Sequence, residues 1–126
     1  MMLHAPAIGD PGVAASLEHG HLVEITTRGR ESGALRRVPL VFHNIGGRIY
    51  LSGRPGRRGW YANLVADPRF TFHLTTGVVA DLPATARPIT EAAERRRLLS
   101  VIATGWSHDL EVMMANAPLV EVTFGG

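Results

Sequence analysis

The residues with the clearest chemical potential are arginines gathered around one turn. Arg30, Arg36 and Arg37 accompany Gly29 and Gly33, and apolar segments lie on either side. Because glycine accepts positive φ without a steric penalty, the two glycines predict a tight turn between two strands. Planar guanidinium groups match phosphate or carboxylate oxygens in pairs, so arginines that converge here would form an anion site. An exposed hairpin with solvated arginines fits the same local pattern, and both interpretations stay open at this point.

Charge is unevenly distributed along the 126 residues, although the formal net charge is only +2. All 13 basic residues are arginine. Residues 28–58 hold eight arginines and one glutamate, which gives this segment a charge of +7. The rest of the chain holds five arginines and ten acids, which gives −5. A basic segment in an otherwise acidic chain is typical of a binding site for an anionic partner.

Composition limits the class of protein. The length predicts one domain, residues 1–126, with residues 1–12 as a loose arm. No apolar run is long enough to predict a transmembrane helix, and the first residues lack the pattern of a signal peptide. The absence of cysteine excludes disulfides and thiol chemistry. These features favour a cytoplasmic protein. The six histidines show no spacing that predicts a metal site.

The hydrophobic pattern predicts a mainly β, α+β fold. Pro39 predicts that its segment lies near a sheet edge or at the start of a strand, because proline cannot donate to a sheet ladder. Thr90 is the expected N-cap of a helix. Short turns between alternating segments predict a small barrel or curled sheet of about six mostly antiparallel strands. The expected strands are 21–28, 37–44, 48–52, 69–75, 78–87 and 119–124, and the expected helices are 13–19, 60–66, 91–104 and 107–115.

Three motifs in order carry a family resemblance. They are Thr27-Arg28-Gly29-Arg30-Glu31-Ser32-Gly33 followed by Arg36 and Pro39-Leu40, then Trp60-Tyr61-Ala62-Asn63-Leu64, then Ala66-Asp67-Pro68. Together they resemble the deazaflavin (F420)-dependent nitroreductase family, which belongs to the split β-barrel flavin-binding oxidoreductases. The resemblance spans roughly residues 21–87 and implies a split β-barrel. One departure is Glu31, where that family usually has lysine.

The resemblance implies a set of cofactor-binding residues. The arginine turn would hold the phosphate and oligoglutamate tail of F420, and the strands around Pro39 and Ser52 would flank its ring system. Arg54 and Arg58 either extend the basic patch or face solvent. No residue is assigned as an indispensable acid or base, and candidate donors near the acceptor are Ser52, Tyr50, Trp106 and His108. The full expected cofactor set is Arg30, Ser32, Arg36, Arg37, Val38, Pro39, Leu51, Ser52, Arg54, Arg58 and Trp60.

The implied function is hydride transfer from reduced F420 to an electron-poor small molecule. The acceptor would be a quinone, an activated alkene or a nitro compound, and the cofactor itself would carry the hydride chemistry. Related barrels bind flavin mononucleotide (FMN), haem or other tetrapyrroles, or lipids, so a different cofactor or a non-enzymatic binding role is the alternative. Nucleic-acid binding is not expected, because few aromatic residues interleave with the basic segment. Related barrels often dimerise, so a homodimer is a further possibility.

Overall fold

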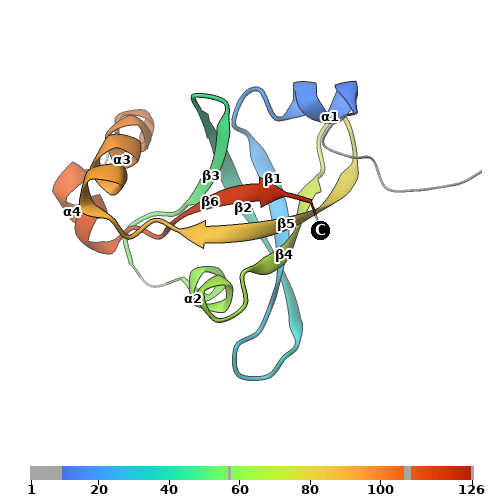
Figure 1. Cartoon of the computed structure of the whole chain (residues 1–126), viewed down its shortest axis with the longest axis horizontal. Helices are drawn as coiled ribbons and strands as arrows, with labels where there is room; N and C mark the ends of the chain where they lie inside the picture. Colours follow the sequence, from blue (N-terminus) through green and yellow to red (C-terminus); the bar gives the residue numbers. More distant parts are fainter. Residues whose placement is uncertain (1–9, 57, 107–108, 126) are drawn as a thin grey trace, which may run out of the picture.

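The computed structural model describes residues 10–56, 58–106 and 109–125. Six strands and four helices lie within these ranges (Figure 1). Two of the expected strands have the predicted bounds, and no boundary of the other elements moves by more than three residues. The elements are α1 (Pro11–Ser16), β1 (Leu22–Arg28), β2 (Leu35–Ile45), β3 (Arg48–Ser52), α2 (Gly59–Ala66), β4 (Arg69–Leu74), β5 (Ala80–Pro88), α3 (Ala92–Trp106), α4 (Leu110–Asn116) and β6 (Leu119–Phe124).

The strands form one closed antiparallel barrel. Their order around it is β1-β2-β3-β6-β5-β4, and β4 pairs with β1 to complete the circle. Strand β2 changes partner along its length: residues 35–41 pair with β1, and residues 42–45 pair with β3. The first part of β2 therefore has one free edge, and Pro39 lies there, as its missing N–H requires. The predicted split β-barrel is confirmed.

Two hydrophobic clusters stabilise the fold. One fills the barrel, where Phe42 of β2 contacts Phe72 of β4 edge to face at a centroid distance of 5.5 Å. The other lies between the outer wall and the helices α3 and α4, with Tyr50 at its base. Successive strand residues face opposite sides, so β3 supplies Leu51 to the barrel and Tyr50 to the helices. Figure 1 shows α3 and α4 together at one end of the barrel and α1 at the other.

The helix termini correct two sequence predictions. Helix α3 is capped by Glu91, whose carboxylate accepts from the backbone N–H groups of Ala93 at 2.8 Å and Glu94 at 3.0 Å. The prediction that Thr90 is the N-cap was therefore wrong, because a longer side chain one residue later reaches the same donors. Helix α1 spans Pro11–Ser16 rather than 13–19, because the Asp10 carboxylate accepts from Gly12 N–H at 2.9 Å and starts the helix early.

The last helix begins later than the sequence pattern predicts. Helix α4 starts at Leu110, after an Asp109 N-cap that accepts from Val112 N–H at 3.1 Å. Ser107 and His108, which the predicted helix included, lie outside the described residues. Across the part of the chain that the structure describes, no helix combines the length and hydrophobicity needed to cross a membrane.

Candidate functional site

The β1–β2 connection is a tight loop that aims two arginines toward one side. It closes through backbone bonds from Gly29 N–H to Ala34 O at 2.7 Å and from Gly33 N–H to Gly29 O at 2.8 Å. Gly33 has a φ of +73°, as the sequence predicts. The prediction of a positive φ at Gly29 was wrong, because Gly29 is not among the glycines with positive φ. A Cβ there would lie 2.9 Å from Ser32 Oγ and 3.1 Å from the backbone oxygen of Ala34, so the close approach of the chain favours glycine at this position.

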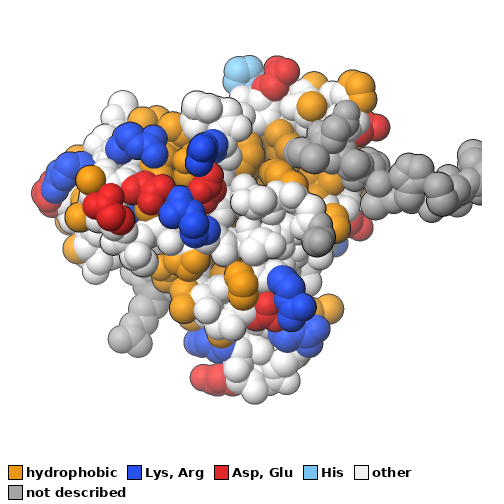
Figure 2. All heavy atoms as spheres, in the orientation of Figure 1, with side chains coloured by type: hydrophobic (Ala, Val, Ile, Leu, Met, Phe, Trp, Pro, Cys, Tyr) orange, Lys and Arg blue, Asp and Glu red, His pale blue; other side chains and the backbone are white. Residues whose placement is uncertain are grey.

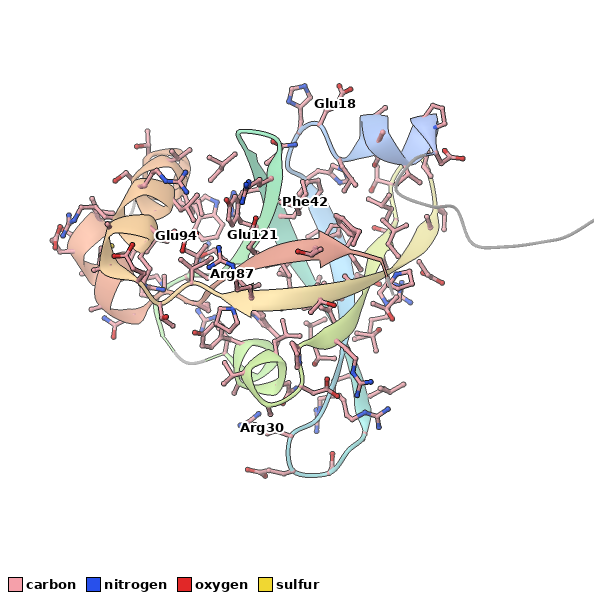
Figure 3. The ribbon with its side chains drawn as sticks, viewed as in Figure 1. Glu18, Arg30, Phe42, Arg87, Glu94 and Glu121 are labelled. Carbon is pink, nitrogen blue, oxygen red and sulfur yellow. The ribbon has the colours of Figure 1, made fainter. Side chains whose placement is uncertain are left out.

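A buried amide ties this loop to helix α2. Asn63 is only 4% exposed, and its Oδ1 accepts from the backbone N–H of Arg30 at 3.2 Å and from Arg30 Nη1 at 2.9 Å. Its Nδ2 donates to Thr27 Oγ1, a buried partner on β1, at 3.1 Å. Figure 3 shows Arg30 on the loop beside α2. Asn63 was not among the predicted site residues, although it lies in the motif Trp60-Tyr61-Ala62-Asn63-Leu64 that carries the family resemblance.

The loop and α2 enclose a cleft of about 470 Å³. Five of the expected cofactor-binding residues meet there, and they come from the loop, from β2 and from α2. The Arg36 guanidinium reaches the cleft without a hydrogen bond or ion pair to any described residue. The lining residues are Thr27, Gly29, Arg30, Glu31, Ser32, Arg36, Val38, Gly59, Trp60 and Asn63.

Helix α2 presents its amino terminus to the same cleft. The helix begins at Gly59, and its N-cap residue Arg58 makes no side-chain bond to the first backbone N–H groups. Gly59 and Trp60 line the cleft. A helix amino terminus carries a partial positive charge, so it adds to the guanidinium groups of Arg30 and Arg36. These groups give the cleft a positive charge that suits an anion, and Glu31 is the one acidic side chain in its lining.

A second cleft of about 550 Å³ shares Trp60 with the first as a lining residue. One wall is the free edge of β2, and the opposite wall is the end of β3 and the segment that follows it. Ser52 is 2% exposed, and its hydroxyl donates to Pro118 O at 2.6 Å, which fixes this wall to the start of β6. The lining is Pro39, Leu40, Val41, Ser52, Gly53, Arg54, Arg58, Trp60 and Trp106. Its apolar walls suit a flat ring, and Arg54 and Arg58 add positive charge.

Three expected site residues do not line either cleft. Arg37 lies on the opposite face of β2 from Arg36, because strand side chains alternate, and it forms an ion pair with Glu24 at 2.5 Å. Leu51 is fully buried in the barrel cluster, and Tyr50 is 1% exposed beneath the helices. A further expected site residue, His108, lies outside the described residues.

A smaller cavity of about 310 Å³ adjoins the second cleft through Val41 and Trp106. His43 lines it and contacts the Trp106 ring at a centroid distance of 5.1 Å. Burial lowers the pKa of His43, and its Nε2 is buried without a hydrogen-bond partner in the described residues. At the sequence level His43 was weighed only as a metal ligand. Among the described residues, no group of three or more side chains could hold a metal ion.

Comparison with known proteins agrees with this geometry. A family model for F420H2-dependent quinone reductase matches residues 8–119. A solved F420H2-dependent reductase, FDR-A, is 27% identical, with a TM-score of 0.59 over 81% of this chain and 93% of that one. A solved structure described as a domain-swapped dimer is 26% identical, with a TM-score of 0.59 over 81% and 79% of the two chains.

A third solved structure, an F420 reductase, shares the fold at 12% identity. Its TM-score is 0.66, and the match covers 89% of this chain and 92% of that one. No curated protein matches the sequence. The family match covers both clefts and most of the barrel, so it describes the molecule as a whole rather than one motif.

Proposed function

Because the chain belongs to the F420H2-dependent quinone reductase family, we propose that its two neighbouring clefts hold the two ends of F420. The basic cleft would take the phosphate and oligoglutamate tail, and the apolar cleft would take the deazaflavin ring. Trp60 lines both clefts, so one cofactor molecule can extend from one to the other past this side chain.

The residues present fit the two halves of this cofactor. The tail is polyanionic, and the first cleft offers Arg30, Arg36 and the open amino terminus of α2. The ring is planar and largely apolar, and the second cleft has Pro39 and Trp106 among its lining residues. Charge-assisted hydrogen bonds contribute roughly 1.5–3 kcal/mol each, so a few of them support micromolar affinity after the costs of binding.

When bound, F420H2 would supply the hydride, and the protein would orient the cofactor and the acceptor and exclude water from them. Pro39, Leu40 and Val41 would support the ring along the free edge of β2, and Ser52 would remain bonded to Pro118 as part of the facing wall. The acceptor would enter on the side of Trp106. We propose an electron-poor small molecule as acceptor: a quinone, an activated alkene or a nitro compound.

One observation carries the proposal: Arg36, uncompensated by any described side chain, lines the same cleft as Arg30 and the uncapped start of α2. The test is a calorimetric titration of the purified protein with F420, FMN and haem. We expect F420 to bind at least tenfold more tightly than FMN or haem, and reduced F420 to be oxidised when a benzoquinone or naphthoquinone is added. Tighter binding of haem or FMN than of F420 would overturn the cofactor assignment.

We further propose that the protein forms a homodimer, since a similar solved structure is described as a domain-swapped dimer. Multi-angle light scattering of the full chain measures this directly. A mass of about twice the 13.6 kDa of one chain is expected, and the mass of a single chain across the accessible concentration range would refute it.

A further inference from the structure

The buried contacts of Asn63 have a consequence for charge. Its Oδ1 receives two bonds from Arg30, one from the backbone and one from the guanidinium group. An amide oxygen accepts these bonds as a carboxylate would, but it carries no net charge. Arg30 is thereby held in place while its positive charge remains available to the cleft.

The alternative at this position would be a carboxylate, which is the usual ion-pair partner of an arginine. Elsewhere in this chain arginines do pair with carboxylates: Arg87 is bonded to Glu94 and Glu121, and Arg96 is bonded to Glu111. A carboxylate in contact with Arg30 would cancel its field where the proposed anionic tail binds. Asn63 orients the arginine without this cost.

We propose that Asn63 is a positioning residue that keeps Arg30 oriented and unneutralised for the anionic tail of the cofactor. This inference rests on the proposed function of the cleft. It assigns to Asn63 a specificity role: the neutral amide selects for a negatively charged ligand segment. The two Arg30 donors require Oδ1 to face the loop, and Thr27 completes the arrangement from the buried side, because its hydroxyl accepts from Asn63 Nδ2.

The decisive variant is Asn63→Asp, which preserves shape and changes charge. The aspartate can accept both bonds from Arg30, and the Thr27 hydroxyl can rotate to donate to it. We expect this variant to fold with a melting temperature equal to or above that of the unsubstituted protein. We expect its Kd for F420 to rise at least tenfold, while its Kd for the tail-less deazaflavin, which lacks the phosphate and glutamates, stays within twofold.

The charge control is Thr76→Asp in the exposed turn between β4 and β5. The register of β4 with β1 puts this turn at the opposite end of the barrel from Arg30. The substitution changes the net charge by the same amount, so we expect both cofactor affinities to stay within twofold. A tenfold loss of F420 affinity in this control would attribute the effect to net charge and overturn the role of Asn63.

A second measurement separates positioning from general damage. Asn63→Ala removes the bonds to Arg30 without placing a charge in the cleft, so it should weaken F420 binding when Arg30 is present. In an Arg30→Ala background it should change the affinity by less than twofold, because the group through which Asn63 acts is then gone. A tenfold loss that persists in that background, or a folded Asn63→Asp variant with unchanged F420 affinity, would overturn the inference. The proposed function fails separately: in that case the unsubstituted protein itself would not prefer F420 to the tail-less deazaflavin.

Discussion

The arginines near the β1–β2 loop and those near the carboxy-terminal helices meet very different partners. Arg30 is bonded to a neutral amide, and Arg36 contacts no described charged group. By contrast, Arg87 bridges Glu94 and Glu121, at 2.7 and 2.8 Å. Figure 3 shows Arg87 between these two glutamates, whereas Arg30 stands apart beside α2. In Figure 2 basic and acidic side chains alternate around the carboxy-terminal helices. The same residue type therefore serves two purposes, and its partner decides which.

This difference explains why net charge alone says little about the protein. Near the carboxy-terminal helices, Arg87 and Arg96 are paired with acids, and Arg95 donates to backbone carbonyls that join α3 to α4. Arg36, whose guanidinium has no partner among the described residues, keeps its charge for a ligand at the cleft. Experiments can therefore separate two effects. Substitutions at the cleft should change the affinity for F420, and substitutions near the helices should change the free energy of unfolding.

The largest effect is expected from removing both cleft arginines. Arg30→Ala and Arg36→Ala should each raise the Kd for F420 at least tenfold, and about a hundredfold together, since each loses charge-assisted bonds to the tail. A tenfold change corresponds to about 1.4 kcal/mol. Calorimetric titration measures the Kd, and Arg96→Ala is the matched control. Unchanged affinity in both single variants would remove the tail site from this cleft.

A reciprocal effect is expected at Arg95. Its guanidinium donates to four backbone carbonyls, those of Ile89 at 3.0 Å, Met113 at 3.2 Å, and Met114 and Ala117 at 2.9 Å. Arg95→Ala removes a donor from each of these partly buried acceptors, of which Met113 O keeps its bond from Ala117 N–H, so the free energy of unfolding should fall by roughly 2 kcal/mol. Urea denaturation measures this loss. Cofactor affinity should stay within twofold. A tenfold loss of affinity without loss of stability would contradict the separation between arginines that bind the ligand and arginines that stabilise the fold.

Much of this arrangement was accessible from the sequence, because it follows from local chemistry. Alternating apolar residues fixed the strands 48–52 and 119–124 without error. The missing N–H of Pro39 predicted a sheet edge or a strand start, and the edge exists because β2 changes partner near residue 41. The motif around Arg30 and Arg36 predicted two residues that the fold does bring to one cleft.

The parts that the sequence could not supply are those decided by distant partners. Arg36 and Arg37 are adjacent in the chain, and only strand register determines that one faces the cleft and the other faces Glu24. The bond between Asn63 and Arg30 spans 33 residues and depends on how α2 docks against the loop. Tyr50 was a candidate donor by residue type, yet the helices that bury it begin about forty residues later.

A smaller effect that depends on pH is expected at Arg87. Its bonds to Glu94 lower the pKa of that carboxyl group below the ordinary value of 4.5, so the pair stabilises the fold above that pH and loses this contribution as the pH falls. Arg87→Ala should cost about 0.5–1 kcal/mol at pH 7, because the partners are partly exposed. Urea denaturation at pH 7 and pH 3 should show this difference shrinking in acid. A constant difference would mean that Glu94 does not contribute through its charge.

The smallest effect is expected at Arg96, immediately next to Arg95. Arg96 is paired with Glu111 at 2.9 Å across the exposed surfaces of α3 and α4. This pairing lowers the pKa of Glu111, but solvent and salt screen such exposed charges over about 8–10 Å. Arg96→Ala should therefore leave the urea midpoint unchanged at 0.5 M NaCl and nearly so at low salt. A clear loss of stability at both salt concentrations would mean that this ion pair, rather than the carbonyl contacts of Arg95, holds α4 against α3.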